Sequence, residues 1–331
     1  LEGARVPYIA SAAGVLAYAA GEPESLPQTT VVWVDRAGRE EALPLEPGYY
    51  ETPILSPDGK TLAIVNNQGA RTSIFTYDLE RNVLSPLLPE AGRSFSQTWT
   101  PDSRRVVFTS FDAGSPRLYW KAADGSGSPE PLSPGEFPEF PSSVSPDGRT
   151  LAYATVTTTP EKTDLWLLDL GGKRERRVWF ETPFKEYGPL FSPDGGLIAY
   201  TAEESGRRPE IYVRPYPGPG GRIKISGGGG QEPLWSANGS ELYYRTWEDD
   251  LMAARIVRSP SLTVSAPRLV LKTQAYLSQS GESHPRQYSI SPDGKRFFFV
   301  KPVEMKRQTI TQIELVTDWA AVFGRRPAEK P

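Results

Sequence analysis

A four-residue turn, Ser-Pro-Asp-Gly, recurs along this chain of 331 residues, and each copy is followed by a run of apolar, β-branched or aromatic residues. Proline presets the backbone angle φ of the first turn position, aspartate bonds nearby backbone amides, and glycine takes the left-handed position that closes a hairpin. Each copy is therefore predicted to join two antiparallel strands. The clear copies begin at Ser56, Ser145, Ser192 and Ser291.

Three further copies, which keep only part of the motif, complete a series with a nearly constant period. They are Thr100-Pro101-Asp102-Ser103, Ser236-Ala237-Asn238-Gly239 and Ser11-Ala12-Ala13-Gly14. The seven anchors, at positions 11, 56, 100, 145, 192, 236 and 291, are separated by 45, 44, 45, 47, 44 and 55 residues. A third strand is expected after each hairpin, at residues 31–34 in the first unit and 311–315 in the last, and a short fourth strand before the next anchor.

Four antiparallel strands in each repeat of this length predict an all-β fold, a β-propeller. Seven anchors predict seven four-stranded blades. Six blades are the alternative, if the weak first unit and the incomplete last unit combine into one blade. The last blade has no evident fourth strand, so we expect residues 1–5, or a segment upstream of Leu1, to supply it; the missing initiator Met suggests a piece of a longer protein. We expect one propeller domain over residues 1–324 and a charged tail over 325–331.

Charge and composition exclude several classes of function. The chain has 37 Lys and Arg against 40 Asp and Glu, a net charge of -3. It therefore lacks the excess of positive charge that attracts nucleic acid or an anionic membrane. With no Cys and one His, it lacks the ligands of thiolate zinc sites and His-cluster metal centres. No apolar run approaches the roughly 20 residues of a membrane helix. We therefore expect a monomer with no metal, no cofactor, no nucleic-acid partner and no membrane insertion of this chain.

Three other features have structural interpretations. His284 lies in Gly-Glu-Ser-His-Pro, which has Pro where a nucleophile elbow needs its second Gly, so it is interpreted as a loop histidine. The glycine run 227–230 lacks the Lys-Ser or Lys-Thr of a phosphate loop and is interpreted as a connection between blades. One aspartate per hairpin is too few for calcium, so turn capping explains the repeated residues. These turn residues are Asp58, Gly59, Asp102, Asp147, Gly148, Asp194, Gly195, Asp293 and Gly294.

Strand register predicts one candidate binding site. The residue five positions before each anchor should lie where the innermost strand enters the central channel. Carboxylates, aromatic faces and a guanidinium gathered there suit a peptide, a sugar or a cationic ligand; the alternative is a polar, water-filled channel with the aromatics packed between blades. A longer interval near Tyr276 and His284 is expected to form a lip over this mouth. The predicted ligand-binding residues are Glu51, Phe95, Glu139, Phe140, Glu186, Tyr187, Glu232 and Arg286.

The repeated Ser-Pro-Asp-Gly-Lys turn resembles the TolB-like, WD-repeat-related propellers of bacteria over nearly the whole chain. Longer strings resemble the carboxy-terminal propeller of membrane-anchored bacterial serine/threonine protein kinases. These strings are residues 14–18, 32–38, 212–221 and 228–235. Three turns depart from the motif, with Ala12-Ala13, Ser103 and Ala237-Asn238 in place of its residues.

That resemblance implies a non-catalytic recognition or scaffold module, the sensor or protein-interaction domain of a larger signalling protein, because the kinase motifs lie in a separate domain of that family and none is found here. It also implies an extracytoplasmic, periplasmic location, with a cytoplasmic one as the alternative. Two enzymatic readings stay open. One is an accessory propeller of a prolyl-oligopeptidase-like hydrolase. The other is a lyase or glycosidase that uses mouth carboxylates such as Glu51 and Glu186.

Overall fold

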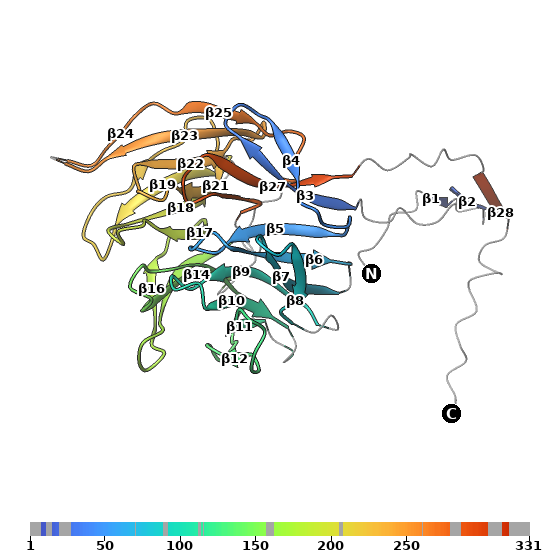
Figure 1. The fold of residues 1–331 in the computed structure, drawn as a ribbon, viewed down its shortest axis with the longest axis horizontal. Coiled ribbons are helices and arrows are strands. Elements are labelled where there is room, and N and C mark those ends of the chain that lie inside the picture. Colours follow the sequence, from blue (N-terminus) through green and yellow to red (C-terminus); the bar gives the residue numbers. More distant parts are fainter. Residues whose placement is uncertain are drawn as a thin grey trace. The chain divides into compact units, whose positions relative to one another are not determined.

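The computed structural model describes residues 28–303, with short gaps at 70, 89–91, 112–113, 115, 157–161, 205–207, 260 and 279–285, and the backbone of three further strands (Figure 1). The chain divides into two compact units, residues 28–303 and the flanking segments 1–27 and 304–331. Strands and turns make up the regular structure of the described residues. None of these residues forms a helix with the length and apolarity that crossing a membrane requires.

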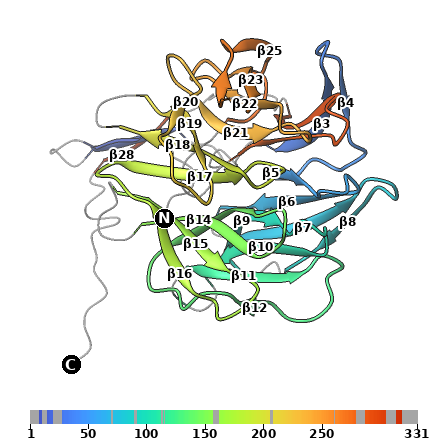
Figure 2. The same ribbon diagram turned by 90° about the vertical axis from the view of Figure 1, so that its left-hand side faces the viewer.

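The unit 28–303 is a β-propeller of antiparallel sheets, each running from an inner strand to an outer edge (Figure 2). Blade 1 contains β5 (Tyr50–Leu55), β6 (Thr61–Asn67), β7 (Thr72–Asp78) and β8 (Val83–Pro86). Blade 2 contains β9 (Ser94–Trp99), β10 (Arg105–Ser110), β11 (Arg117–Ala122) and β12 (Glu130–Pro131). Blade 3 contains β13 (Glu139–Val144), β14 (Thr150–Thr155), β15 (Asp164–Asp169) and β16 (Arg176–Phe180).

The ring continues with three more sheets. Blade 4 contains β17 (Lys185–Phe191), β18 (Leu197–Glu203), β19 (Glu210–Pro215) and β20 (Ile223–Lys224). Blade 5 contains β21 (Gln231–Trp235), β22 (Glu241–Arg245), β23 (Asp250–Val257), β24 (Thr263–Val264) and β25 (Arg268–Lys272), the last two both paired with β23. The closing blade contains β26 (Tyr288–Ile290), β27 (Arg296–Pro302), β3 (Thr29–Asp35) and β4 (Glu40–Ala42).

The closing blade joins the two ends of this unit. Arg296 to Pro302 of β27 pair antiparallel with Asp35 to Thr29 of β3, and Figure 1 shows β27, in red, beside β3, in blue. The described residues 28–303 therefore form six blades, the predicted alternative, rather than seven. The strand at 31–34 pairs with the last hairpin instead of the first. The fourth strand of that blade is β4, not residues 1–5 as predicted; those residues lie outside the described part of the chain.

The other unit contains β1 (Tyr8–Ala10), β2 (Val15–Ala19) and β28 (Ile313–Thr317). β2 pairs with β1 on one side and with β28 on the other, both antiparallel. The prediction that residues 311–315 form the third strand of the last blade is wrong, since β28 pairs with β2 and β3 takes the place beside β27. The turn at residues 11–14 lies outside the described part of the chain.

The repeated turns have one geometry. In the first, the Ser56 hydroxyl donates to Asp58 Oδ1 at 2.6 Å, and the backbone N–H of Lys60 donates to the same oxygen at 3.1 Å. Gly59 has a φ of 75°, and the same left-handed conformation recurs at Gly148, Gly195, Gly239 and Gly294. The two variant turns within the described residues keep this geometry too: Ser103 adopts a φ of 59°, and Asn238 Oδ1 accepts from Ser236 Oγ at 2.9 Å.

The core lies between neighbouring blades. Ile54, Val65 and Leu87 of blade 1 pack with Trp99 and Phe108 of blade 2, and comparable clusters fill the other junctions. Hydrogen bonds between inner strands add to this packing. The indole of Trp99 donates to Ile54 O at 2.9 Å, and Phe191 N–H donates to Ser143 Oγ at 3.0 Å.

Candidate functional site

The predicted site lies where the inner strands begin, and this end of the ring is called the mouth. Inner strands of neighbouring blades contact one another from β26 to β5, β9, β13, β17 and β21. Most of these strands carry a bulge just after the mouth. Thr52, Ser96, Gly188 and Glu232 all have a φ between 46° and 63° there, and the pairing register shifts beside each of them. A bulge redirects side chains, so residues on either side of it face different surroundings.

An aromatic cluster forms one wall of the mouth. Phe95 and Phe140, both predicted site residues, lie with ring centroids 6.4 Å apart, and Phe95 stacks on Phe111 at 5.6 Å. The Arg93 guanidinium lies 5.1 Å from the centroid of the Phe111 ring. Phe95 and Phe111 are half-buried and Arg93 is exposed, so this wall presents both an apolar and a cationic surface.

Glu51 and Arg286 are also half-buried at the mouth. The Asn67 side-chain amide donates to Glu51 Oε1 at 3.1 Å, and burial raises the pKa of the Glu51 carboxyl. Arg286 Nε donates to Tyr288 O at 3.0 Å. These two side chains and Phe95 are the predicted residues that solvent reaches most.

The other three predicted carboxylates are buried: Glu139, Glu186 and Glu232 are 2%, 1% and 0% exposed. Glu139 accepts from Ser133 Oγ and, at 3.4 Å, from an Arg176 guanidinium nitrogen. Burial raises the pKa of Glu139 although these two partners oppose it. The bonds tie the start of β13 to neighbouring parts of blades 2 and 3, so this carboxylate has a structural role here.

Glu232 lies deepest. Its Oε2 accepts from the Gln287 backbone N–H at 3.1 Å and lies 3.9 Å from a nitrogen of Arg245, which is itself fully buried. Arg245 also donates to the carbonyl oxygens of Leu277 at 2.6 Å and Thr273 at 3.1 Å. Burial raises the pKa of Glu232, and Arg245 acts in the opposite direction. This pair connects blade 5 to the segment that leads into the closing blade.

Glu186 has a strongly perturbed carboxyl at the mouth. Thr182 Oγ1 donates to its Oε1, whereas its Oε2 is buried without a hydrogen-bond partner among the described residues. Burial, with a smaller contribution from the Asp164 charge, raises the pKa of Glu186 to about 7. The adjacent Tyr187 is 4% exposed and packs with Tyr200 and Tyr212 in the core.

Of the lip, Tyr276 is described and His284 is not. Tyr276 stacks on Phe299 at 4.6 Å and donates to Glu40 at 3.0 Å, so it packs on the closing blade. No group of three or more His, Asp or Glu side chains within the described ranges is placed to hold a metal ion.

Four residues of the mouth are not among the predicted ligand-binding residues: Arg93, Phe111, Phe137 and Trp247. Phe137 and Trp247 are 42% and 52% exposed. They lie just before β13 and in the β22–β23 turn, and both segments lie at the mouth end because antiparallel strands alternate direction. Mapping the connections between second and third strands onto the mouth would have found Phe111 and Trp247.

Comparison with known proteins identifies relatives of this fold. A family model described as the TolB beta propeller domain matches residues 7–159. The Tol-Pal system protein TolB of Anaeromyxobacter dehalogenans is 28% identical over 133 residues, which cover 40% of this chain and 28% of that protein. The solved structure of a putative TolB from Agrobacterium tumefaciens has a TM-score of 0.67 and 17% identity, covering 85% of this chain and all of that one.

The fold is a TolB-like β-propeller. The match spans less than a third of the length of the TolB protein from Anaeromyxobacter dehalogenans. The same architecture also occurs in an enzyme: an oligogalacturonate lyase, solved in complex with manganese, has a TM-score of 0.51 and 13% identity over 91% of this chain and 99% of its own. The fold alone therefore does not separate a binding module from an enzyme.

Proposed function

We propose that this propeller is a non-catalytic recognition module that binds a protein or small ligand through its mouth. We further propose that it is the sensor or protein-interaction domain of a larger bacterial signalling protein, on the extracytoplasmic side of a membrane. The kinase-like sequence strings and the likeness to TolB support this context. The observation that carries the proposal is the half-buried cluster of Phe95 and Phe111 under the exposed Arg93.

The composition of the accessible mouth favours a protein partner. Large aromatic side chains and arginines supply most of the binding energy at protein interfaces. Phe137 and Trp247 are both more than 40% exposed, and they lie at the same end of the ring as Arg93, Phe95 and Phe111. Water-exposed aromatic surface of this kind is stabilised when a partner covers it.

The burial of the acids argues against glycoside cleavage at this mouth. A glycosidase holds two carboxyl groups on either side of the bond that it cuts, and both must reach the substrate. Glu139, Glu186 and Glu232 are instead enclosed by protein, and Glu51, the fourth predicted carboxylate, is half-buried with its Oε2 covered. This arrangement supports binding over catalysis.

The test is affinity capture from a native envelope extract, followed by binding measurements with each purified candidate. The mouth variant is Phe111→Ala with Phe137→Ala, and the control is Lys60→Ala with Lys295→Ala, at exposed positions of the opposite end. We expect wild type and control to bind a shared partner, and the mouth variant to bind it at least about tenfold more weakly. Equal affinities for all three proteins would contradict recognition at the mouth.

A further inference from the structure

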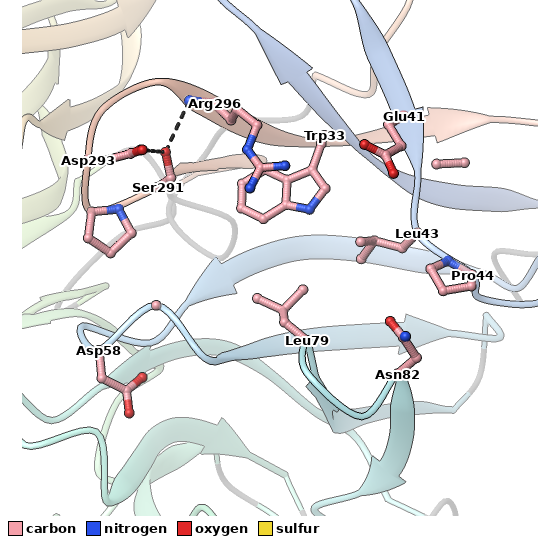
Figure 3. Close-up of a pocket in the computed structure, with 13 residues that line it drawn as sticks. Trp33, Glu41, Leu43, Pro44, Asp58, Leu79, Asn82, Ser291, Asp293 and Arg296 are labelled. Carbon is pink, nitrogen blue, oxygen red and sulfur yellow. Dashed lines mark hydrogen bonds between the residues drawn. The ribbon is translucent and has the colours of Figure 1, made fainter.

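The end of the ring opposite the mouth carries a cavity of about 620 Å³, between the closing blade and blade 1. Trp33 and Glu41 of the closing blade form one side, and Leu79 and Asn82 of the β7–β8 hairpin form the other. Figure 3 shows the Arg296 guanidinium lying over the Trp33 indole, with Leu79 below the ring. The volume falls within the range of ordinary ligand pockets.

The propeller contains a second copy of this groove, and that copy is filled. Between blades 2 and 3, Trp120 contacts two guanidinium groups, with Arg105 4.1 Å and Arg174 4.5 Å from its ring centroid. The Trp120 indole donates to Glu130 Oε2 at 2.7 Å. Arg105 comes from the same blade as Trp120, whereas Arg174 comes from the β15–β16 hairpin of the following blade.

Strand register makes the two grooves equivalent. Trp120 pairs with Glu130 on the outer strand of blade 2, and Trp33 pairs with Glu41 on the outer strand of the closing blade. The second strands correspond as well: Arg296 lies 4.2 Å from the Trp33 ring centroid, matching Arg105 over Trp120. Each aromatic side chain packs toward the next blade, as Trp33 does with blade 1 and Trp120 with blade 3.

The grooves differ in the cross-strand neighbour of the tryptophan and at one hairpin position. Trp33 pairs with Phe298, whose ring centroid lies 3.4 Å from that of Trp33, whereas Trp120 pairs with Val107. Arg174 has a φ of 58° and Asn82 a φ of 56°, and each immediately precedes the residue where its outer strand rejoins the sheet. Arg174 reaches across to Trp120 and also donates to Leu170 O at 3.0 Å. Asn82 has a short side chain, and its Oδ1 accepts from Tyr77 at 3.0 Å within its own blade. Its groove therefore keeps the space that Arg174 fills in the other.

The empty groove also has charge to complement a cation. Within the described part of the chain, Glu41 and Asp58 line the cavity without an ion pair to any Lys or Arg. Leu79 corresponds to Leu170, since both are the first residue after their third strand and both donate their N–H to the second-strand hairpin, at Lys60 O and Arg149 O. The Leu79 carbonyl is thus the counterpart of the acceptor that Arg174 uses.

We propose that this groove binds an arginine side chain of a partner protein, in the place that Arg174 occupies between blades 2 and 3. Arginine fits better than lysine because its planar guanidinium stacks on aromatic rings and donates in a fixed plane. The site is separate from the mouth and does not depend on the function proposed there. It makes the propeller a module with two docking ends, one aromatic and one selective for guanidinium.

The test uses a capped pentapeptide, Gly-Gly-Lys-Arg-Glu, copied from residues 171–175, and two variants in which lysine or citrulline replaces its arginine. Binding is followed by the indole N–H signal of Trp33 in nitrogen–proton correlation spectra, assigned with Trp33→Phe. We expect a saturable shift with the arginine peptide, about fivefold weaker binding of the lysine peptide and at least about tenfold weaker binding of the neutral citrulline peptide.

Two protein variants complete the test. Asn82→Arg supplies the guanidinium from the chain itself and should abolish the Trp33 shift, whereas Asn82→Gln should bind like wild type. Glu41→Gln, at an exposed position, should weaken binding about threefold. Folding of each variant is checked by circular dichroism. No saturable Trp33 shift, equal affinity for all three peptides, or full binding by a folded Asn82→Arg protein would each overturn the proposal.

Discussion

The guanidinium of Arg296 lies 4.2 Å from the ring centroid of Trp33, although the two residues come from opposite ends of the propeller's sequence. The contact exists because β27 and β3 are neighbouring strands of the closing blade. It is a local consequence of how the ring closes, and it marks the groove that the pentapeptide experiment probes.

The interior of the closing blade should contribute strongly to stability. Phe298 is fully buried and packs with Leu62 and Ile64 of blade 1. Phe298→Ala should lower the free energy of unfolding by about 3–5 kcal/mol through lost burial and the cavity left behind. Phe137→Ala, at an exposed aromatic position, is the control and should change it by less than about 1 kcal/mol. Urea denaturation measures both, and similar values for the two variants would show that the closing blade is loosely packed.

The buried Arg245 should be costly to remove. Arg245→Met leaves Glu232 in the interior without its counter-charge, which should lower the free energy of unfolding by about 3–5 kcal/mol. Glu232→Gln should cost less, because Arg245 keeps its bonds to two carbonyl oxygens and its ion pair with Asp249 at 3.2 Å. In a double-mutant cycle the two changes should be non-additive by about 1 kcal/mol or more. Additive effects would show that the two charges do not interact.

Glu186 should make stability fall as pH rises. Its pKa is about 7 in the folded protein against an ordinary value of 4.5, so the folded state binds the proton more tightly than the unfolded state. The resulting stability is present in full below pH 4.5 and is lost as pH rises through 7. Glu186→Gln should thus match wild type near pH 4.5 and exceed its free energy of unfolding at pH 8.5, by on the order of 3 kcal/mol. Urea denaturation across this range gives the difference, and a difference independent of pH would refute the assignment.

Each turn aspartate should stabilise its turn through one carboxylate oxygen, Oδ1. Asp194 Oδ1 accepts from Ser192 Oγ at 2.6 Å and from Gly196 N at 3.1 Å. Asp194→Ala should lower the free energy of unfolding by about 1 kcal/mol. Asp194→Asn keeps an acceptor at this position, as Asn238 does in its own turn, and should retain most of the stability at high salt, where the Arg258 ion pair is screened. If the Ala and Asn variants were equally stable, the oxygen would have no role in the turn.

The sequence was sufficient to predict the architecture because the same turn is repeated at every hairpin. Ser56, Ser145, Ser192 and Ser291 mark ends of inner strands whose period specifies four-stranded blades. Ring closure was harder to predict. The strand around Trp33 is equally compatible with the hairpin before it and with the hairpin at the far end of the ring, and only three-dimensional packing chooses between them.

For the candidate site, the sequence predicts which residues begin the inner strands but not how exposed their side chains are. Register places Phe95 and Phe140 at the starts of neighbouring inner strands, where their ring centroids lie 6.4 Å apart. It does not reveal that the bulges turn Glu232 inward or that Glu186 is covered, because burial depends on neighbouring blades. The groove beside Trp33 was not predicted at all, since Glu41 and Arg296 become neighbours of one indole only when β27 pairs with β3.

The pairing of Thr29 with Pro302 gives the propeller a mechanical weak point. The chain enters and leaves the ring at one end of a single antiparallel strand pair. Tension applied between those two residues loads the hydrogen bonds of β3 and β27 one after another, beginning at this terminal pair. It does not load them all at the same time, as shear along the strands would. Stretching the chain across the propeller should therefore peel the closing blade at low force, while the other five blades, each made of consecutive strands, stay folded.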